Sequence, residues 1–127
     1  MSNMLVTGGT GNIGMYAVAE FIRRGHDVVV LDRVSASPIL QSIAPAARIV
    51  QGDILDVEHM SRTVEANAVD HILHLAAFLG PESSSDPIKA VTVNCQGTAN
   101  VFDVALRHGV KRVCWSSSIA AIGVMPT

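Results

Sequence analysis

The sequence predicts an α/β domain built on a doubly wound parallel sheet with helices on both of its faces. Short runs rich in valine, isoleucine and leucine alternate with longer stretches whose apolar residues recur at helical spacing. Such alternation indicates strands that are joined by helical crossovers and therefore pair in parallel. The run VVVL at 28–31 is apolar throughout, which is typical of a strand covered on both sides. With 127 residues and no internal repeat, the chain is expected to form one domain over 1–127.

Five strands are expected, and we expect the sheet order 3-2-1-4-5. The predicted strands are Met4–Val6, Val28–Leu31, Ala47–Val50, His71–Leu75 and Arg112–Trp115.

The first two helices are indicated by apolar spacing. Ile13, Ala17 and Phe21 recur every four residues and are expected to form one apolar face of a helix. Gly25 stands where this helix would end. A second, short helix is expected over Pro38–Ile43.

Two further helices follow the third and fourth strands. Asp56 is expected to cap the helix over Val57–Val64. A longer helix over Ile88–Phe102, closed by Gly109, carries an apolar stripe that is expected to be mostly core. The serine-rich segment Gly80–Pro87 is expected to be a loop.

Composition excludes several classes of function. The net charge is −2 and no basic block is present, so we expect no nucleic-acid partner. The apolar runs are too short to cross a bilayer, and no signal peptide is evident, so we expect no membrane partner and a cytoplasmic location. The two cysteines and five histidines lack metal-ligand spacing, and His71 and His74 should face opposite sides of one strand. We therefore expect no metal site.

A glycine-rich turn joins the first strand to the first helix. Residues 7–14, TGGTGNIG, fit G-x-G-x-x-G through Gly9, Gly11 and Gly14, and T-G-x-x-G-x-x-G with Gly8 as the first glycine. Either pattern permits a tight turn, a close approach of pyrophosphate to the backbone, and close packing of helix on strand. The N–H groups at the helix start then attract phosphates. Met15 replaces the lysine of a triphosphate-binding loop, so a dinucleotide is favoured; a merely tight turn is the alternative.

The second strand ends in a candidate ribose ligand. Asp32 lies 18 residues after Gly14, close to the spacing expected for a carboxylate that accepts hydrogen bonds from an adenosine ribose. A carboxylate repels a 2′-phosphate, so Asp32 favours NAD over NADP. Arg33 is the opposing signal, because a guanidinium pairs with that phosphate or stacks on adenine. A turn-forming aspartate is the structural alternative.

Several motifs in order resemble one known family, the NAD-dependent epimerase/dehydratase family of extended short-chain dehydrogenases/reductases, which act largely on nucleotide sugars. The chain is similar to its N-terminal Rossmann part through TGGTGNIG (7–14), GDILD (52–56), HLAA (74–77), VNCQGTANVFDVA (93–105) and SSSIAAIG (116–123). The resemblance and the glycine turn together imply cofactor contacts at Gly8, Gly11, Asn12, Ile13, Asp32, Arg33, Asp53, Ile54, Leu75, Ala76, Ala77, Asn94 and Ser116.

Ser118 is the catalytic residue that the resemblance implies. In the family the last serine of the S-S-S-x-x-x-Y-G motif hydrogen-bonds the substrate oxygen, and a tyrosine, helped by a lysine four residues on, transfers the proton. Here Ile122 stands where that tyrosine is usual, and the single tyrosine, Tyr16, has Glu20 four residues on. We therefore expect a fragment of a longer enzyme that does not turn over by itself.

The predicted function is NAD binding in an epimerase/dehydratase-type oxidoreductase that moves a hydride at a carbinol, with a nucleotide sugar as substrate of the full-length protein. A non-catalytic dinucleotide-binding module, such as a redox sensor or a subunit completed by a partner, is the alternative. A homo-oligomer is expected, because the helix over Ile88–Phe102 contributes to a dimer in the family. The bare edge of the fifth strand is a second reason to expect self-association.

Overall fold

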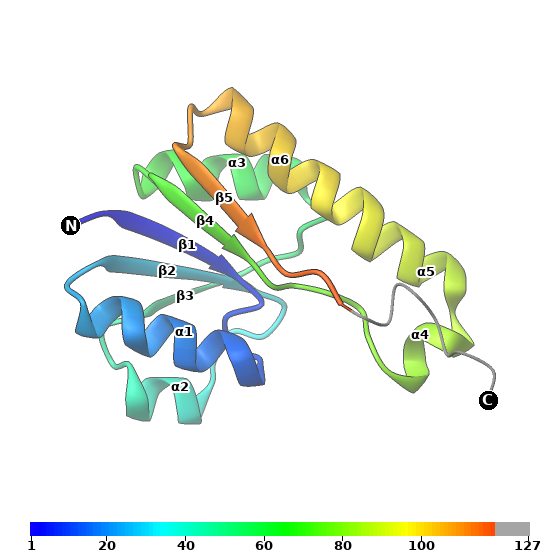
Figure 1. Cartoon of the computed structure of the whole chain (residues 1–127), viewed down its shortest axis with the longest axis horizontal. Coiled ribbons are helices and arrows are strands. Elements are labelled where there is room, and N and C mark those ends of the chain that lie inside the picture. Colours follow the sequence, from blue (N-terminus) through cyan, green and yellow to red (C-terminus); the bar gives the residue numbers. More distant parts are fainter. Residues whose placement is uncertain (119–127) are drawn as a thin grey trace.

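The computed structural model describes residues 1–118, without the side chains of residues 81 and 82. A parallel sheet of five strands forms its centre (Figure 1). The strands are β1 (Asn3–Thr7), β2 (Asp27–Asp32), β3 (Arg48–Gln51), β4 (His71–His74) and β5 (Arg112–Trp115).

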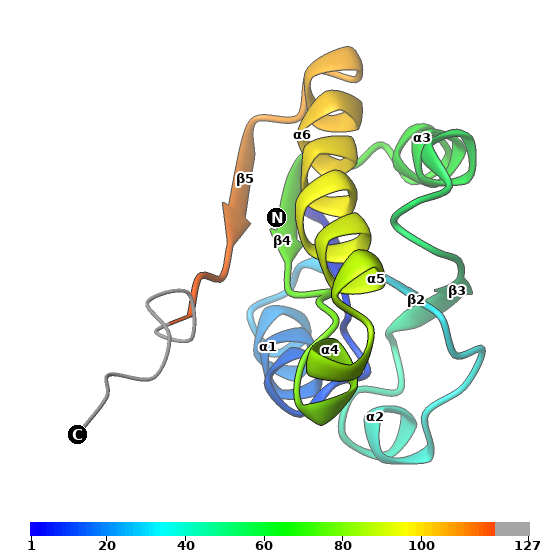
Figure 2. The ribbon, with the colours of Figure 1, turned by 90° about the vertical axis from the view of Figure 1, so that its right-hand side faces the viewer.

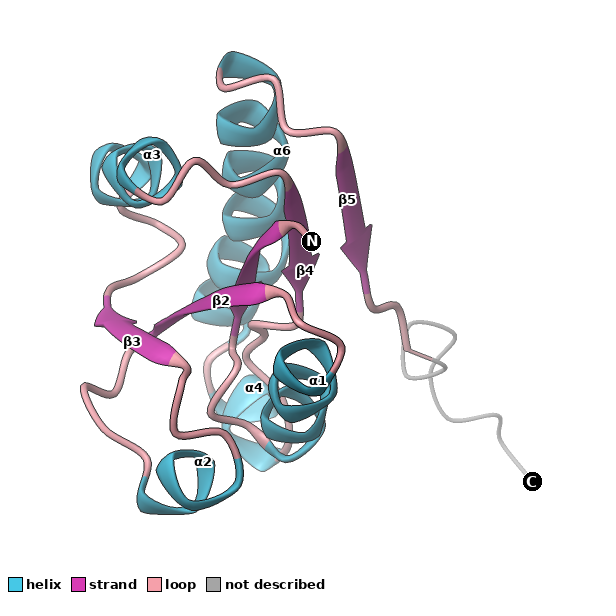
Figure 3. Cartoon of the chain, turned by 90° about the vertical axis from the view of Figure 1, so that its left-hand side faces the viewer, coloured by secondary structure: helices cyan, strands magenta, loops and turns pink. Residues whose placement is uncertain are grey.

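The predicted strand order is confirmed. The sheet runs β3-β2-β1-β4-β5, and every neighbouring pair is parallel. Figure 3 shows β3 and β5 at opposite edges of this sheet. One register row places Thr7, His74 and Trp115 side by side at the carboxyl ends of their strands.

Helices cover both faces of the sheet, as predicted. One face carries α1 and α2, and the other carries α3 and α6 (Figures 1 and 2). The helical segments are α1 (Asn12–Arg23), α2 (Pro38–Ile43), α3 (Val57–Ala66), α4 (Pro81–Ser85), α5 (Pro87–Val91), the π-helical η1 (Thr92–Gln96) and α6 (Gly97–Arg107). Within the described residues, none of these helices combines the length and the apolar character that a membrane span needs.

Two apolar cores result from the alternation of side chains along the strands. Leu5, Val29 and Ile72 point toward α3 and α6, where they pack with buried residues of those helices. Val6 and Val30, on the opposite sheet face, pack with buried residues of α1 and α2. Burial of both strand faces explains why the β2 sequence is apolar without interruption.

Side-chain caps begin three of the helices. Asp56 accepts a hydrogen bond from the backbone N–H of His59 at the start of α3, as predicted. Ser37 caps α2 and Asp86 caps α5 in the same way, each before a proline at the first helical position. The end of α1 is also as predicted, since Gly25 follows it with φ of +82°.

The predicted apolar face of α1 is wrong at Ile13, although Phe21 packs partly buried against the core. Its buried residues are Gly14, Met15 and Val18, whereas the side chain of Ile13 is 75% exposed. The helix starts so close to the glycine turn that its smallest residue, Gly14, faces inward. Ile13 is thereby turned outward, at the carboxyl end of the sheet.

The apolar stripe over Ile88–Phe102 is not core in the described chain, contrary to the prediction. Ile88 is 81% exposed and Val91 is 62% exposed, while the face of α6 that packs on the sheet consists of Gly97, Val101 and Val104. The helical stretch is continuous, but the π-turn η1 adds residues per turn and shifts the phase between α5 and α6. A constant helical period applied across this stretch therefore assigns residues of α5 and α6 to one face, although they lie on different faces.

The segment Gly80–Pro87 also differs from its predicted loop, because residues 81–85 form the short helix α4. Gly80, with φ of +77°, precedes it, and Asp86 separates it from α5.

Candidate functional site

The predicted site residues gather beyond the carboxyl ends of the strands. In Figure 1 all five strands point toward this end, where α1 begins and where α4 and α5 lie. The chain crosses from β1 to β2 on one side and from β3 to β4 on the other, so the winding reverses between β1 and β4. Open parallel sheets bind ligands in the crevice at such a reversal.

The glycine turn after β1 is packed so tightly that it excludes side chains. Gly8 has φ of +69°, and a Cβ atom there would lie 2.7 Å from the backbone nitrogen of Ala76. A Cβ atom on Gly14 would lie 2.7 Å from the Cα atom of Gly9. These contacts bring β1, β4 and the start of α1 together at backbone distance, as the motif predicts.

The start of α1 presents free backbone donors toward the crevice. Gly11 is its N-cap and supplies no side-chain acceptor, and no acidic residue lies in the first turn. Gly11, Asn12 and Ile13 are all exposed. The partial positive charge of this helix terminus is thus available to an anion.

Asp32 is tied to the glycine turn. Its Oδ2 atom accepts hydrogen bonds from the backbone N–H of Thr10 at 3.1 Å and from the Thr10 hydroxyl at 2.7 Å. Its Oδ1 atom accepts the backbone N–H of Arg33 at 2.7 Å. A carboxylate has about four acceptor positions, so three bonds leave room for a further donor. The carboxylate is thereby held beside the turn, while the Arg33 side chain is exposed.

Asp53 and Ile54 follow β3 at the same end of the sheet. The Asp53 carboxylate accepts the backbone N–H of Leu55 at 2.9 Å. The Ile54 side chain is buried against Gly97 of α6. Its carbonyl accepts the amide N–H of Asn100 at 3.0 Å.

Leu75, Ala76 and Ala77 follow β4 beside the glycine turn, where the backbone of Ala76 lies against Gly8. Asn94, in η1, fixes the chain just beyond them. Its Oδ1 atom accepts the backbone N–H of Phe78 at 2.8 Å, and its Nδ2 atom donates to the carbonyl of Phe78 at 3.0 Å. The Asn94 amide thus orders the segment between β4 and α4.

Ser116 and Ser118 follow β5, and both are exposed. The backbone N–H of Ser116 donates to the carbonyl of His74 at 3.3 Å, which keeps this segment beside β4. Ile122 lies outside the described residues.

Sequence reasoning missed one part of the site, a buried polar network beneath the crevice. The Nδ1 atom of His74 lies 2.6 Å from the hydroxyl of Thr7, and its Nε2 atom lies 3.0 Å from the hydroxyl of Thr98. Burial lowers the pKa of His74 below its ordinary value of 6.5. The predicted opposite orientation of His71 and His74 is confirmed, since His71 lies on the α1 side of the sheet. The contact with Thr7 depends on strand register, which the sequence does not show.

Comparison with known proteins agrees with this geometry. Residues 4–127 match the family described as the NAD dependent epimerase/dehydratase family. The chain belongs to this family. It is 36% identical over 119 residues to a UDP-glucose 4-epimerase of Lacticaseibacillus casei, covering 93% of this chain and 36% of the relative.

Solved structures of other proteins have the same fold. A UDP-glucose 4-epimerase from Stenotrophomonas maltophila, with bound NAD and formylated UDP-arabinopyranose, superposes with a TM-score of 0.88 at 31% identity, over 100% of this chain and 40% of that one. An L-threonine dehydrogenase from Clostridium difficile superposes with a TM-score of 0.83 at 25% identity, over 95% of this chain and 38% of that one. The present chain thus spans less than half the length of these relatives.

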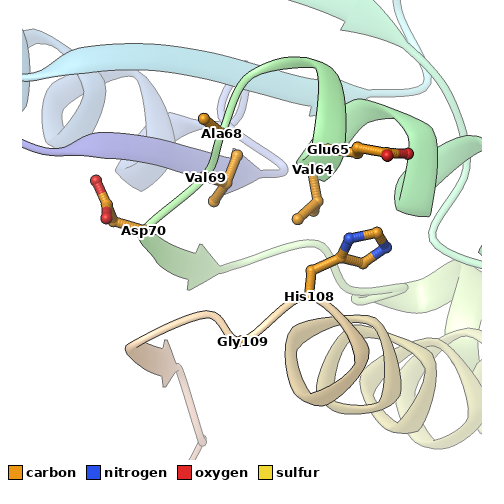
Figure 4. A pocket seen from close by; sticks show the side chains of 7 residues that line it. All are labelled: Val64, Glu65, Ala68, Val69, Asp70, His108 and Gly109. Carbon is orange, nitrogen blue, oxygen red and sulfur yellow. The ribbon is translucent and has the colours of Figure 1, made fainter.

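Two hollows of this epimerase/dehydratase chain lie away from the predicted site. One, between the ends of α3 and α6, is lined by Val64, Glu65, Ala68, Val69, Asp70, His108 and Gly109 (Figure 4). The other lies between α1 and the β4–β5 part of the sheet, where the Nδ1 atom of His71 is buried without a hydrogen-bond partner among the described residues. No group of three or more potential metal ligands is found in the described part of the chain.

Proposed function

We propose that this chain is the NAD-binding part of an epimerase/dehydratase-type oxidoreductase that acts on a nucleotide sugar. The observation that carries the proposal is the hydrogen-bonded pair of Thr10 and Asp32, which joins the glycine turn to the end of β2 at the reversal of the sheet. This pair holds the Asp32 carboxylate beside the start of α1, which supports a ribose contact next to a phosphate contact. Curated and solved relatives with UDP-sugar names support the substrate class.

The chain's residues would divide the dinucleotide between them. The pyrophosphate lies along the segment Gly8–Ile13, against the backbone N–H groups of Asn12 and Ile13 at the start of α1, because the N–H groups of Gly8, Thr10 and Gly11 already donate within the protein. The adenosine ribose lies on Asp32. The negative charge of Asp32 opposes a 2′-phosphate and so favours NAD over NADP. Asp53 and the backbone of Ile54 border the adenine.

The nicotinamide end would lie on the β4 and β5 side, against Leu75–Ala77, Asn94 and Ser116. NAD, when bound, accepts a hydride from a substrate carbinol. Ser118 would hydrogen-bond the oxygen of that carbinol, as the resemblance implies. Transfer of the proton requires an acid/base residue. Tyr16 does not match the tyrosine that has this role in the family, because the residue four positions after it is Glu20 and not lysine.

Titration of NAD tests the proposal directly. Gly11→Val would place a branched side chain where the pyrophosphate approaches the backbone, and we expect at least a hundredfold loss of affinity by isothermal titration calorimetry. Asp32→Ala removes the proposed ribose hydrogen bond together with the bonds that hold the glycine turn, and should weaken binding about tenfold, while reducing the preference for NAD over NADP. Asp27→Ala is the matched control, because this exposed carboxylate lies at the opposite end of the same strand. Unchanged affinity in both site variants would exclude the assignment.

Self-association is a second expected property. Ile88, Val91 and Leu106 are exposed on the α5–α6 helical stretch, and Trp115 is 54% exposed on the edge strand β5. Apolar burial contributes roughly 25 cal/mol per Å², so a second copy that covers this side gains a large driving force. Sedimentation velocity at several concentrations should therefore show a species heavier than the 13.4 kDa chain.

Matched surface variants locate this contact. Val91→Glu should shift the equilibrium to monomer. Ile39→Glu should not, because Ile39 is similarly exposed, at 60%, but lies on α2 at another face. A monomer at every concentration of the unaltered chain would contradict the expectation.

A further inference from the structure

We propose that His74 is a positioning residue that holds the glycine turn and the segment after β4 at the separation which the dinucleotide requires. This inference rests on the proposed function, since it concerns the same crevice. It extends that function to a buried side chain that does not itself touch the ligand.

His74 lies directly beneath the crevice and bridges three elements. It is register partner to Thr7 across β1 and β4, and both side chains are buried. Its ring also reaches Thr98 of α6. The buried imidazole is thus hydrogen-bonded to two hydroxyl groups inside an apolar core. Among the described residues, its hydrogen-bond partners carry no charge.

The positions of the protons in this network follow from which of its atoms must accept hydrogen bonds. The Thr98 hydroxyl donates to the carbonyl of Asn94 at 2.7 Å, so it can only accept from His74, whose Nε2 atom must carry the proton. In the neutral ring Nδ1 is then an acceptor, and the Thr7 hydroxyl donates to it. Burial favours this neutral form, because it lowers the pKa of His74.

The Thr7 hydroxyl is thereby turned so that its lone pairs face the chain after β4. It accepts the backbone N–H groups of Leu75 and Ala76, each at 3.3 Å. The backbone of Ala76 is also the part of the chain that packs on Gly8. A Cβ atom on Gly8 would lie 2.7 Å from the Ala76 nitrogen. His74 therefore orients the group that holds the backbone of Ala76 against Gly8.

The same hydrogen-bond network extends to Phe78, in the segment between β4 and α4. Thr98 holds the backbone of Asn94, and the Asn94 side chain holds both backbone groups of Phe78. One line of hydrogen bonds thus runs from the residue before the glycine turn to the segment between β4 and α4. Loss of the ring would break the link between Thr7 and Thr98, and with it the connection between the glycine turn and α6.

Three substitutions at position 74 separate the two bonds of the ring. His74→Asn keeps an acceptor near the Nδ1 position and so keeps the bond from Thr7. His74→Gln keeps a donor near Nε2 and so keeps only the bond to Thr98. His74→Phe fills the space and makes neither bond.

The affinities for NAD and for AMP distinguish positioning from mere stability. AMP needs only the Asp32 side of the crevice, whereas NAD spans it. We expect His74→Phe and His74→Gln to weaken NAD about tenfold, His74→Asn to rescue most of that loss, and AMP affinity to stay within about twofold in all three, each checked as folded by circular dichroism. Equal losses for NAD and AMP, or an unchanged NAD affinity in His74→Phe, would overturn the proposal.

Amide hydrogen exchange of the ligand-free protein tests the network without any cofactor. The Ala76 amide should be protected in the unaltered protein and in His74→Asn, and should exchange at least tenfold faster in His74→Phe. Equal exchange in all of them would refute the positioning role. An unaltered protein that shows this protection but does not bind NAD would instead contradict the proposed function alone.

Discussion

Replacing Gly14 by alanine is expected to lower the free energy of unfolding by about 3 kcal/mol, which would make it one of the most destabilising single-methyl additions in the chain. A Cβ atom there would lie 2.7 Å from the Cα atom of Gly9, which is backbone and cannot move aside as a side chain does. Alanine is favoured over glycine inside helices by about 1 kcal/mol, so the expected sign is opposite to that of helix propensity.

Gly97→Ala is the matched control for this experiment. Gly97 is also helical, but a Cβ atom there meets the side chain of Ile54, whose Cγ1 atom lies at 2.8 Å and whose rotamer can adjust. Urea denaturation of the two variants should therefore give a clearly smaller loss for Gly97→Ala, about 1 kcal/mol. Equal losses, or a Gly14→Ala variant that is more stable than the parent, would show that α1 does not pack against the turn as closely as described.

Acidification is expected to destabilise the fold through His74, by up to about 1.4 kcal/mol per pH unit. Burial lowers the pKa of His74 in the folded state below 6.5, the value expected for the unfolded chain. Between these two values the unfolded chain binds more protons at this position than the folded chain does. The stabilisation that neutral His74 contributes is therefore fully present above pH 6.5. It falls as the pH decreases, until the pH reaches the pKa of His74 in the folded state.

Comparison with His74→Asn isolates this contribution. Urea denaturation at pH values from 7.5 to 5 should give a shallower decline for His74→Asn than for the parent. Two carboxylates titrate in a separate range: hydrogen bonds from Arg23 and Arg24 lower the pKa of Glu20 to about 2, and the Asn3 backbone and Lys111 lower that of Asp70. Their stabilisation is lost only at lower pH, below their unfolded values of 4.5 and 3.8. Identical slopes for parent and variant above pH 5 would exclude a neutral buried His74.

The exposed and buried patterns of the two longest helical stretches show where sequence periodicity is insufficient. Ile13 was expected on the apolar face of α1, but the close contact of Gly14 with the turn sets the rotation of the helix. In α5–α6 the π-turn changes the phase of the helix, so that Ile88 and Val101 lie on different faces. Periodicity indicates that a helix exists, but neighbouring backbone decides which side is buried.

By itself the sequence determined the strands, their order, the Asp56 cap of α3, and the carboxyl-end location of the glycine turn and Asp32. These features depend on local chemistry: apolar β-branched runs form strands, glycine readily adopts the φ of +69° found at Gly8, and parallel strands bring their carboxyl ends to one edge. Only the tertiary structure decided that Thr10 holds Asp32, and that His74 links Thr7 to Thr98. These partners are 22, 67 and 24 residues apart, and a hydrogen bond between them exists only in one register of the sheet and one rotation of α6. A shift of one residue in a strand turns its side chains to the other face, so no local pattern in the sequence contains these contacts.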